Sequence, residues 1–127
     1  MVFQYTDAFV TIATTDIENI VLFYTEFLGE KPIKLIPNVY GEFQLIGVKL
    51  GIFQPKKTNE SEFINSLKSK ISLCLEVSNL EDAIAHLTAL GYPPPGKITT
   101  ASHGREIYAY DPDGNRIILH QSKMDSR

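Results

Sequence analysis

The sequence has little of three things that many functional classes require: cysteine, excess positive charge and long apolar runs. Cys74 is the only cysteine among 127 residues, so no disulfide forms within the chain, and a reducing cytoplasm suits it. The formal net charge of −3 provides no basic field for a phosphate backbone. No apolar run approaches the roughly 18 residues of a membrane span, and the opening stretch lacks the pattern of a signal peptide. We therefore expect a cytoplasmic protein without nucleic-acid or membrane partners.

The composition is that of a globular protein. Apolar residues make up 43% of the chain and charged residues 21%. At 127 residues, folding should bury roughly two-thirds of the surface of the unfolded chain, which is enough for a core. We expect one domain over residues 1–127.

Two segments of the chain repeat one pattern. "VTIATTDIENIVLFYTEFLG" and "LCLEVSNLEDAIAHLTALG" both read as a strand, a polar cap, an amphipathic helix and Leu-Gly. Asp16 and Asn79 are suited to cap the two helices at their N-termini, and Gly29 and Gly91 to end them. Each helix carries apolar residues at helical spacing. The sequence therefore predicts two similar halves.

Short β-rich runs complete each half. The first half is predicted to contain strands in "AFVTIAT", "IKLI", "EFQLI" and "VKLGIF", and the second in "KISLCLEV", "KITTAS", "EIYAYD" and "RIILHQ". The polar stretch "PKKTNESE" reads as a linker, with room for a helical turn in "FINSL". We place module one at about 8–54, the linker at about 55–69 and module two at about 70–121.

The stretch "YDPDGNRI" predicts a tight hairpin turn. Pro112 presets φ for a type I turn, Asp111 can accept a backbone hydrogen bond, and Gly114 tolerates positive φ. These residues are expected to be structural. Strand alternation then places Ile118 on the same face as Arg116 and His120.

Together, the two helix motifs and "YDPDGNRI" resemble the vicinal oxygen chelate superfamily, which includes glyoxalase I, bleomycin-resistance proteins and extradiol dioxygenases. The resemblance covers about Phe9 to Gln121. It implies an α+β fold of two tandem βαβββ modules that form a pseudo-symmetric curved sheet around a cleft. It does not imply one reaction, because this fold hosts several chemistries as well as binding alone.

The resemblance also implies where a metal would be bound. In the metalloenzymes of this superfamily, four side chains from the first and last strands of each module hold one divalent ion, which acts as a Lewis acid. Three of the matching positions here are Phe9, Ser72 and Ile118. The fourth is Gly51, with Phe53 as the register alternative. None of these is a normal metal ligand, so we expect no metal and no cofactor.

Other side chains are candidate ligands or catalytic groups. Glu76, Cys74 and His120 could bind zinc in a rebuilt site, but their spacing matches no known motif. For His120 we expect a structural partner and ligand contact rather than catalysis, and we assign no catalytic residue. His103 lies in a polar loop that could bind substrate, whereas His86 lies off the apolar stripe of its helix and should meet solvent.

Tyr108 and Tyr110 are two residues apart and should project to one face of their strand. If that face is turned inward, the rings form an aromatic wall, and if outward, they could serve a subunit interface. The sequence leaves both possibilities open.

Together with the resemblance, whose family members usually pair, these features predict metal-independent binding of a small organic molecule by a homodimer. Eight residues are expected around the cavity, where a mostly apolar wall with few polar groups suits such a ligand: Phe9, Thr11, Gly51, Phe53, Ser72, Cys74, Ile118 and His120. Because Gly51 has no side chain, it should leave space for part of the ligand. One alternative is a divergent glyoxalase-like lyase, isomerase or dioxygenase with a rebuilt metal site. Another is a dimeric structural or interaction module.

Overall fold

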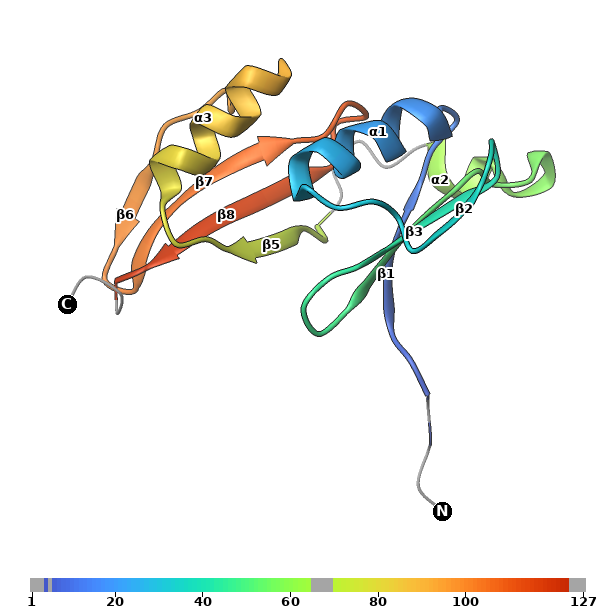
Figure 1. Cartoon of the computed structure of the whole chain (residues 1–127), viewed down its shortest axis with the longest axis horizontal. Helices are drawn as coiled ribbons and strands as arrows, with labels where there is room; N and C mark the ends of the chain where they lie inside the picture. The colour runs from blue at the N-terminus through green and yellow to red at the C-terminus, as the bar shows by residue number, and fades with distance from the viewer. Residues whose placement is uncertain (1–3, 5, 65–69, 124–127) are drawn as a thin grey trace. The chain divides into compact units, whose positions relative to one another are not determined.

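Two βαβββ modules make up the protein. The structure, a computed structural model, describes residues 4, 6–64 and 70–123, and the chain divides into compact units at 1–65 and 66–127. Module one contains β1 (Phe9–Ala13), α1 (Ile17–Leu28), β2 (Lys34–Ile36), β3 (Tyr40–Gln44) and β4 (Lys49–Phe53). Module two contains β5 (Leu73–Glu76), α3 (Leu80–Leu90), β6 (Thr99–Ala101), β7 (Gly104–Tyr110) and β8 (Arg116–Ser122) (Figure 1). The predicted α+β fold and its repeat are confirmed.

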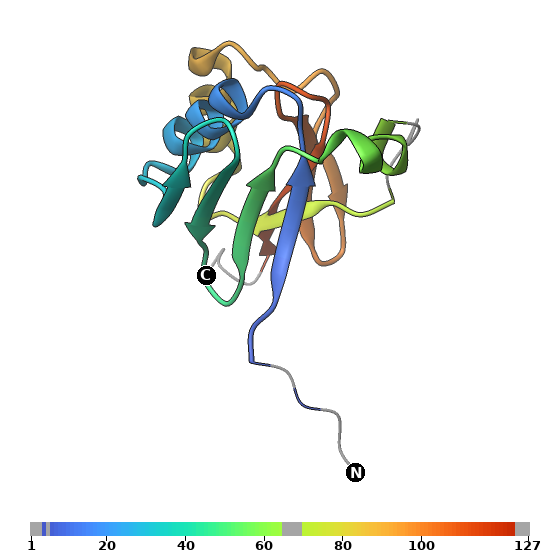
Figure 2. The same ribbon diagram turned by 90° about the vertical axis from the view of Figure 1, so that its right-hand side faces the viewer.

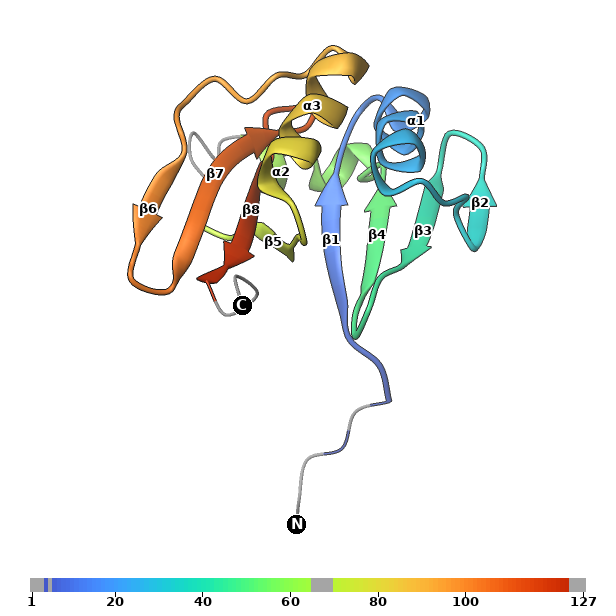
Figure 3. The ribbon, with the colours of Figure 1, turned by 60° about the vertical axis from the view of Figure 1, so that its left-hand side comes forward.

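Each module forms one four-stranded mixed sheet with the same topology. The strand orders are β1-β4-β3-β2 in module one and β5-β8-β7-β6 in module two. In both, the first strand pairs in parallel with the last, and the other neighbours pair antiparallel. Figure 3 shows β1, β4, β3 and β2 side by side in this order.

The two long helices begin and end where the local sequence predicts. The Asp16 side chain accepts a hydrogen bond from the Asn19 backbone N–H, and the Asn79 side chain accepts one from Asp82. Gly29 ends α1 with φ of 72°, a left-handed conformation that costs a glycine little. Both predicted caps are therefore confirmed.

Each helix covers one face of its own sheet. In α1, Tyr24 is fully buried, and its ring centroid lies 6.4 Å from that of Phe43 on β3. In α3, Leu80 and Leu87 are fully buried. The strands turn their most buried side chains to these helical faces: Phe43, Leu50 and Ile52 in module one, and Ile107, Ala109, Ile117 and Leu119 in module two. Because side chains alternate along a strand, the neighbouring residues form the opposite face, which we call the open face.

The hairpin turn between β7 and β8 is structural, as predicted. Asp111 is 3% exposed, and its carboxylate accepts hydrogen bonds from the backbone N–H groups of Asp113 and Asn115. Gly114 adopts φ of 85°. The turn fixes the register that places Ile117 against α3 and Ile118 on the open face.

The segment after β4 folds into two short helical turns, η1 (Lys57–Asn59) and α2 (Ser61–Ile64). In Figure 2, α2 lies beside the ends of β1 and β4. The predicted turn in "FINSL" coincides with α2 only in part, and residues 65–69 of the predicted linker lie outside the described residues. Within the part of the chain that is described, no helix is long and apolar enough to cross a membrane.

Candidate functional site

The residues expected around a cavity fall into two sets, one in each module. Phe9, Thr11, Gly51 and Phe53 lie on the open face of module one. In module two, Cys74, Ile118 and His120 lie on the open face, and Ser72 immediately precedes β5. That the two sets line one shared cavity stays a prediction.

The strand register identifies Gly51 as the counterpart of Ile118. Thr11 is paired with Gly51, and Cys74 is paired with Ile118. Thr11 and Cys74 each lie two residues after a position at which the resemblance places a first ligand. Gly51, rather than Phe53, is therefore the residue at which the resemblance places the metal ligand on the last strand of module one.

The donor set at the four implied metal positions does not fit a metal. The side chains at Phe9 and Ile118 offer no lone pair, and Gly51 has no side chain. The Ser72 hydroxyl oxygen accepts a hydrogen bond of 2.9 Å from the Arg116 guanidinium. Among the described residues, no group of three or more His, Cys, Asp and Glu side chains is placed to hold a metal ion. The proposed zinc set of Glu76, Cys74 and His120 accordingly forms no such group.

The space beside Gly51 is already occupied by the protein. A Cβ atom added at Gly51 would lie 2.8 Å from the Tyr40 hydroxyl oxygen. That hydroxyl donates a 2.9 Å hydrogen bond to the Glu42 carboxylate. Glu42 is only 6% exposed, and its carboxylate lies 3.9 Å from the Lys49 ammonium. Burial, followed by the Glu42 contact, raises the pKa of Tyr40 to about 12. The expectation that Gly51 leaves room for a ligand is therefore wrong, because Tyr40 from the neighbouring strand fills it.

A hollow of about 450 Å³ lies where β4 leaves the sheet of module one. Its apolar wall includes Phe53 and Phe63, whose ring centroids are 5.4 Å apart with planes at 83°. The lining residues are Phe53, Gln54, Pro55, Lys56, Asn59, Glu62 and Phe63. An aromatic wall with a few polar groups at its edge can hold a flat organic molecule.

The middle of the open face in module two is apolar and aromatic. Cys74, Ile118 and Tyr108 lie side by side across β5, β8 and β7. Tyr110 shares this face, so both tyrosines lie on the side away from α3. Burial, together with the charges of Glu106 and Glu76, raises the pKa of the Cys74 thiol. A thiol whose pKa is raised is a weak nucleophile at neutral pH.

The end of the same open face is polar. His120 Nδ1 lies 2.7 Å from Glu76 Oε1, and His120 Nε2 lies 3.2 Å from His103 Nδ1. The hydrogen bond from His120, and then that from the Ser122 backbone N–H, lower the pKa of Glu76. His120 thus has the structural partner that we expected. His86, on α3, is exposed as predicted.

Comparison with known proteins bears on the same features. The family model described as Glyoxalase/Bleomycin resistance protein/Dioxygenase superfamily matches residues 8–119. The chain belongs to this superfamily. The family hosts more than one chemistry, so membership establishes the fold and not a reaction. No curated protein matches the chain.

Solved structures of superfamily proteins share the fold at low sequence identity. A glyoxalase/bleomycin resistance protein/dioxygenase family enzyme from Burkholderia phytofirmans has a TM-score of 0.78 and 17% identity, covering 92% of this chain and 99% of its own. A glyoxalase-related enzyme from Fulvimarina pelagi has a TM-score of 0.75 and 21% identity, with coverage of 94% and 89%. A lactoylglutathione lyase from Agrobacterium tumefaciens has a TM-score of 0.72 and 15% identity, covering 98% of both chains.

Several residues of the site were not anticipated from the sequence. The sequence predicts Glu42 only as part of a strand and Phe63 only as part of a helical turn, and it assigns no role to Tyr40. A glycine opposite a carboxylate on a neighbouring strand would have been a signal, but it is visible only once the register is known. The sequence indicates His103 as a possible substrate-binding residue, but it does not indicate the contact of His103 with His120.

Proposed function

We propose that this superfamily member binds a small, flat organic molecule without the aid of a metal. The observation that carries the proposal is the hollow of about 450 Å³ at the end of β4. Small-molecule sites typically enclose about 300–1,000 Å³ and combine apolar walls with a few polar groups. The Phe53 and Phe63 rings provide the wall, and Lys56 and Glu62 add one charge of each sign to the lining.

The metal-independent part of the proposal is supported by the chemistry of the implied ligand positions. Phe9, Gly51 and Ile118 cannot donate to an ion, and a carbonyl substrate could not be chelated there. Removing apolar surface from water, at about 25 cal/mol per Å², is sufficient to hold a ligand without chelation.

A dye-binding experiment tests the hollow directly. The fluorescence of 8-anilinonaphthalene-1-sulfonate should rise on binding, equally with and without EDTA. Phe63→Ala should weaken its affinity about tenfold, which corresponds to about 1.4 kcal/mol of lost contact. Leu22→Ala is the control, because Leu22 is also an exposed apolar residue and lies neither in the hollow nor among the residues expected around a cavity. If Phe63→Ala and Phe53→Ala bind the dye as the parent does, the hollow is not the binding site.

We also propose that the protein is a homodimer. The supporting feature is β2, an outer strand of its sheet with exposed Leu35 and Ile36 and the exposed Ile33 and Val39 on either side. An exposed apolar outer strand tends to pair with another chain. Light scattering at micromolar concentration should give twice the chain mass, and a strict monomer would refute the proposal.

A further inference from the structure

Three side chains of module two form a continuous hydrogen-bonded line on its open face. Glu76 Oε1 is 2.7 Å from His120 Nδ1, and His120 Nε2 is 3.2 Å from His103 Nδ1. The second oxygen of Glu76 accepts a hydrogen bond of 2.6 Å from the Ser122 backbone N–H. The line therefore starts at a carboxylate fixed on both oxygens and ends at an exposed imidazole.

The carboxylate sets the direction of every hydrogen bond in this line. The pKa of Glu76 is lowered by its His120 and Ser122 contacts, so the group is ionised at neutral pH and can only accept hydrogen bonds. In neutral His120 the proton is then on Nδ1, which leaves a lone pair on Nε2. His103 in turn must donate from Nδ1 to that lone pair. The remaining nitrogen, His103 Nε2, is left as an acceptor.

The backbone at Gly104 allows the two imidazoles to meet. Gly104 has φ of 147°, and a Cβ atom there would collide with the Gln121 carbonyl oxygen and lie 3.1 Å from the His120 ring. A glycine at this position lets the first residue of β7 approach β8 closely. His103 is thereby held with its ring centroid 5.3 Å from that of His120.

We propose that His103 Nε2 is a proton-accepting site for a weakly acidic hydroxyl group, a phenol or an enol, of a bound organic molecule. His103 is the residue that touches the ligand, and His120 and Glu76 are positioning residues. The hydroxyl proton moves to Nε2, the O–H electron pair stays on the ligand oxygen, and the new imidazolium keeps its Nδ1–H bond to His120. Glu76 balances the positive charge at the far end of the line.

The neighbouring surface suits the body of such a molecule. Ile118 and Tyr108, one step along the same open face, offer an apolar and aromatic contact beside His120. Glu106, paired with His120 across the ladder, adds a negative charge that favours a protonated imidazole at this end of the face. All of these residues belong to module two, so a failure of binding at the hollow in module one would not affect the proposed site at His103.

Nitrogen-15 NMR of the imidazoles in the intact protein tests which nitrogen donates and which accepts in each hydrogen bond of the line. In the parent, His103 and His120 should both be Nδ1–H tautomers. In Glu76→Gln, the Ser122 N–H holds the amide oxygen, so the amide nitrogen faces His120 Nδ1 and donates to it. Both histidines should then change to Nε2–H tautomers. An Nε2–H tautomer for His103 in the parent, or no change in Glu76→Gln, overturns the inference.

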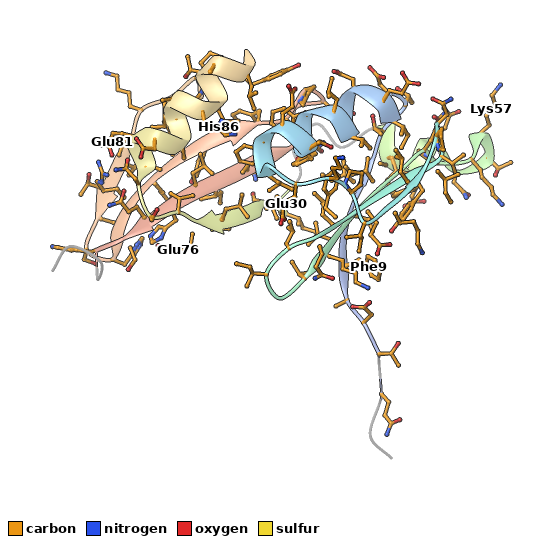
Figure 4. All side chains as sticks on the ribbon, viewed as in Figure 1. Phe9, Glu30, Lys57, Glu76, Glu81 and His86 are labelled. Atoms are coloured by element: carbon orange, nitrogen blue, oxygen red, sulfur yellow. The ribbon has the colours of Figure 1, made fainter. Side chains whose placement is uncertain are left out.

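Chemical reactivity provides the second measurement. Diethyl pyrocarbonate reacts with an imidazole lone pair, and His86 on α3, on the other side of the sheet from Glu76, is an internal reference (Figure 4). In Glu76→Gln, the rate at His103 relative to His86 should fall about tenfold, since hydrogen bonds to charged groups shift equilibria by roughly that factor. The matched control is Glu81→Gln, which removes another carboxylate of module two, 2.6 Å from Arg105, and should leave the ratio unchanged. An equal ratio in Glu76→Gln and the parent refutes the inference.

Proton acceptance itself is measured with 4-nitrophenol, whose ionised form is yellow. At a pH where the free phenol is partly protonated, adding the parent protein should increase the phenolate absorbance. His103→Gln should abolish this gain, and Glu81→Gln should keep it. No gain with the parent, or an equal gain with His103→Gln, overturns the assignment of His103.

Discussion

At the middle of its open face, module one places Gly51 between Thr11 and Glu42, whereas module two places Ile118 between Cys74 and Tyr108 at the same points of the ladder. The glycine in module one is covered by the Tyr40 hydroxyl, so that position is polar and filled. The isoleucine in module two makes the same position apolar.

Two residues further along β4 and β8 the contrast is reversed, with an apolar position in module one and a polar position in module two. Module one pairs Phe53 with Tyr40, next to the aromatic hollow. Module two pairs His120 with Glu76 and Glu106, which form a charged and polar end. The repeat therefore fixes where side chains lie, and individual substitutions decide whether each half offers an apolar wall or a proton acceptor.

The largest effect is expected where the two modules are most alike, in the layer beneath each helix. Leu50 and Ile117 are both fully buried and precede Gly51 and Ile118, respectively. Leu50→Ala and Ile117→Ala should each reduce the free energy of unfolding by about 2–5 kcal/mol. Urea denaturation measures this, with Ile46→Ala, at an exposed position, as a control that should change little. A loss below about 1 kcal/mol for either would contradict the common packing of the modules.

A substitution at Gly51 tests the contact by which module one differs from module two. Gly51→Ala forces the Tyr40 hydroxyl away and breaks its hydrogen bond to Glu42, which should cost about 1–3 kcal/mol of unfolding free energy. The pKa of Tyr40 should also fall from about 12 toward its ordinary 10.0, as measured by NMR titration of its ring. Gly96→Ala is the control, because a Cβ atom there meets nothing within 4 Å. Equal stability of the two variants would show that Tyr40 does not fill the site.

The single thiol reports on the charged end of module two. Because Glu106 contributes to the raised pKa of Cys74, Glu106→Gln should lower that pKa and increase the thiolate fraction at neutral pH. Labelling by Ellman's reagent at neutral pH should accelerate roughly severalfold. Glu81→Gln should leave the rate unaltered, and a slower reaction in Glu106→Gln would contradict the proposed electrostatics.

The smallest effect concerns the ion pair between α3 and β7. Arg105 lowers the pKa of Glu81 to about 2 from an ordinary value of 4.5. A lowered pKa means that the stabilisation is complete above pH 4.5 and is lost as the pH falls toward 2. The melting temperatures of the parent and Glu81→Gln should differ slightly at neutral pH and converge in this range. A gap that widens on acidification would contradict the assignment.

The elements of the fold were predictable because their signals are local. Asp16, Asn79 and the glycines after each helix define the helix ends within a few residues, and "DPDG" defines a turn from four. Counting from these fixed points placed Ile118 on the open face correctly.

The interiors of the two sites were not predictable, since they depend on contacts across strands. The Tyr40 hydroxyl reaches Gly51 only through the β3–β4 register, which the apolar pattern of either strand does not specify. His103 reaches His120 only because Gly104 allows a close approach to β8. Phe63 contributes to the hollow from a helical turn whose apolar spacing is too short to read.

Mass spectrometry and elemental analysis of the protein purified without chelator test the claim that the protein holds an organic molecule and needs no metal for it. Native spectra should show a small organic adduct that denaturing conditions release, with divalent metal well below one per chain. About one nickel, zinc, iron or manganese ion per chain, lost on His120→Ala, would contradict the claim.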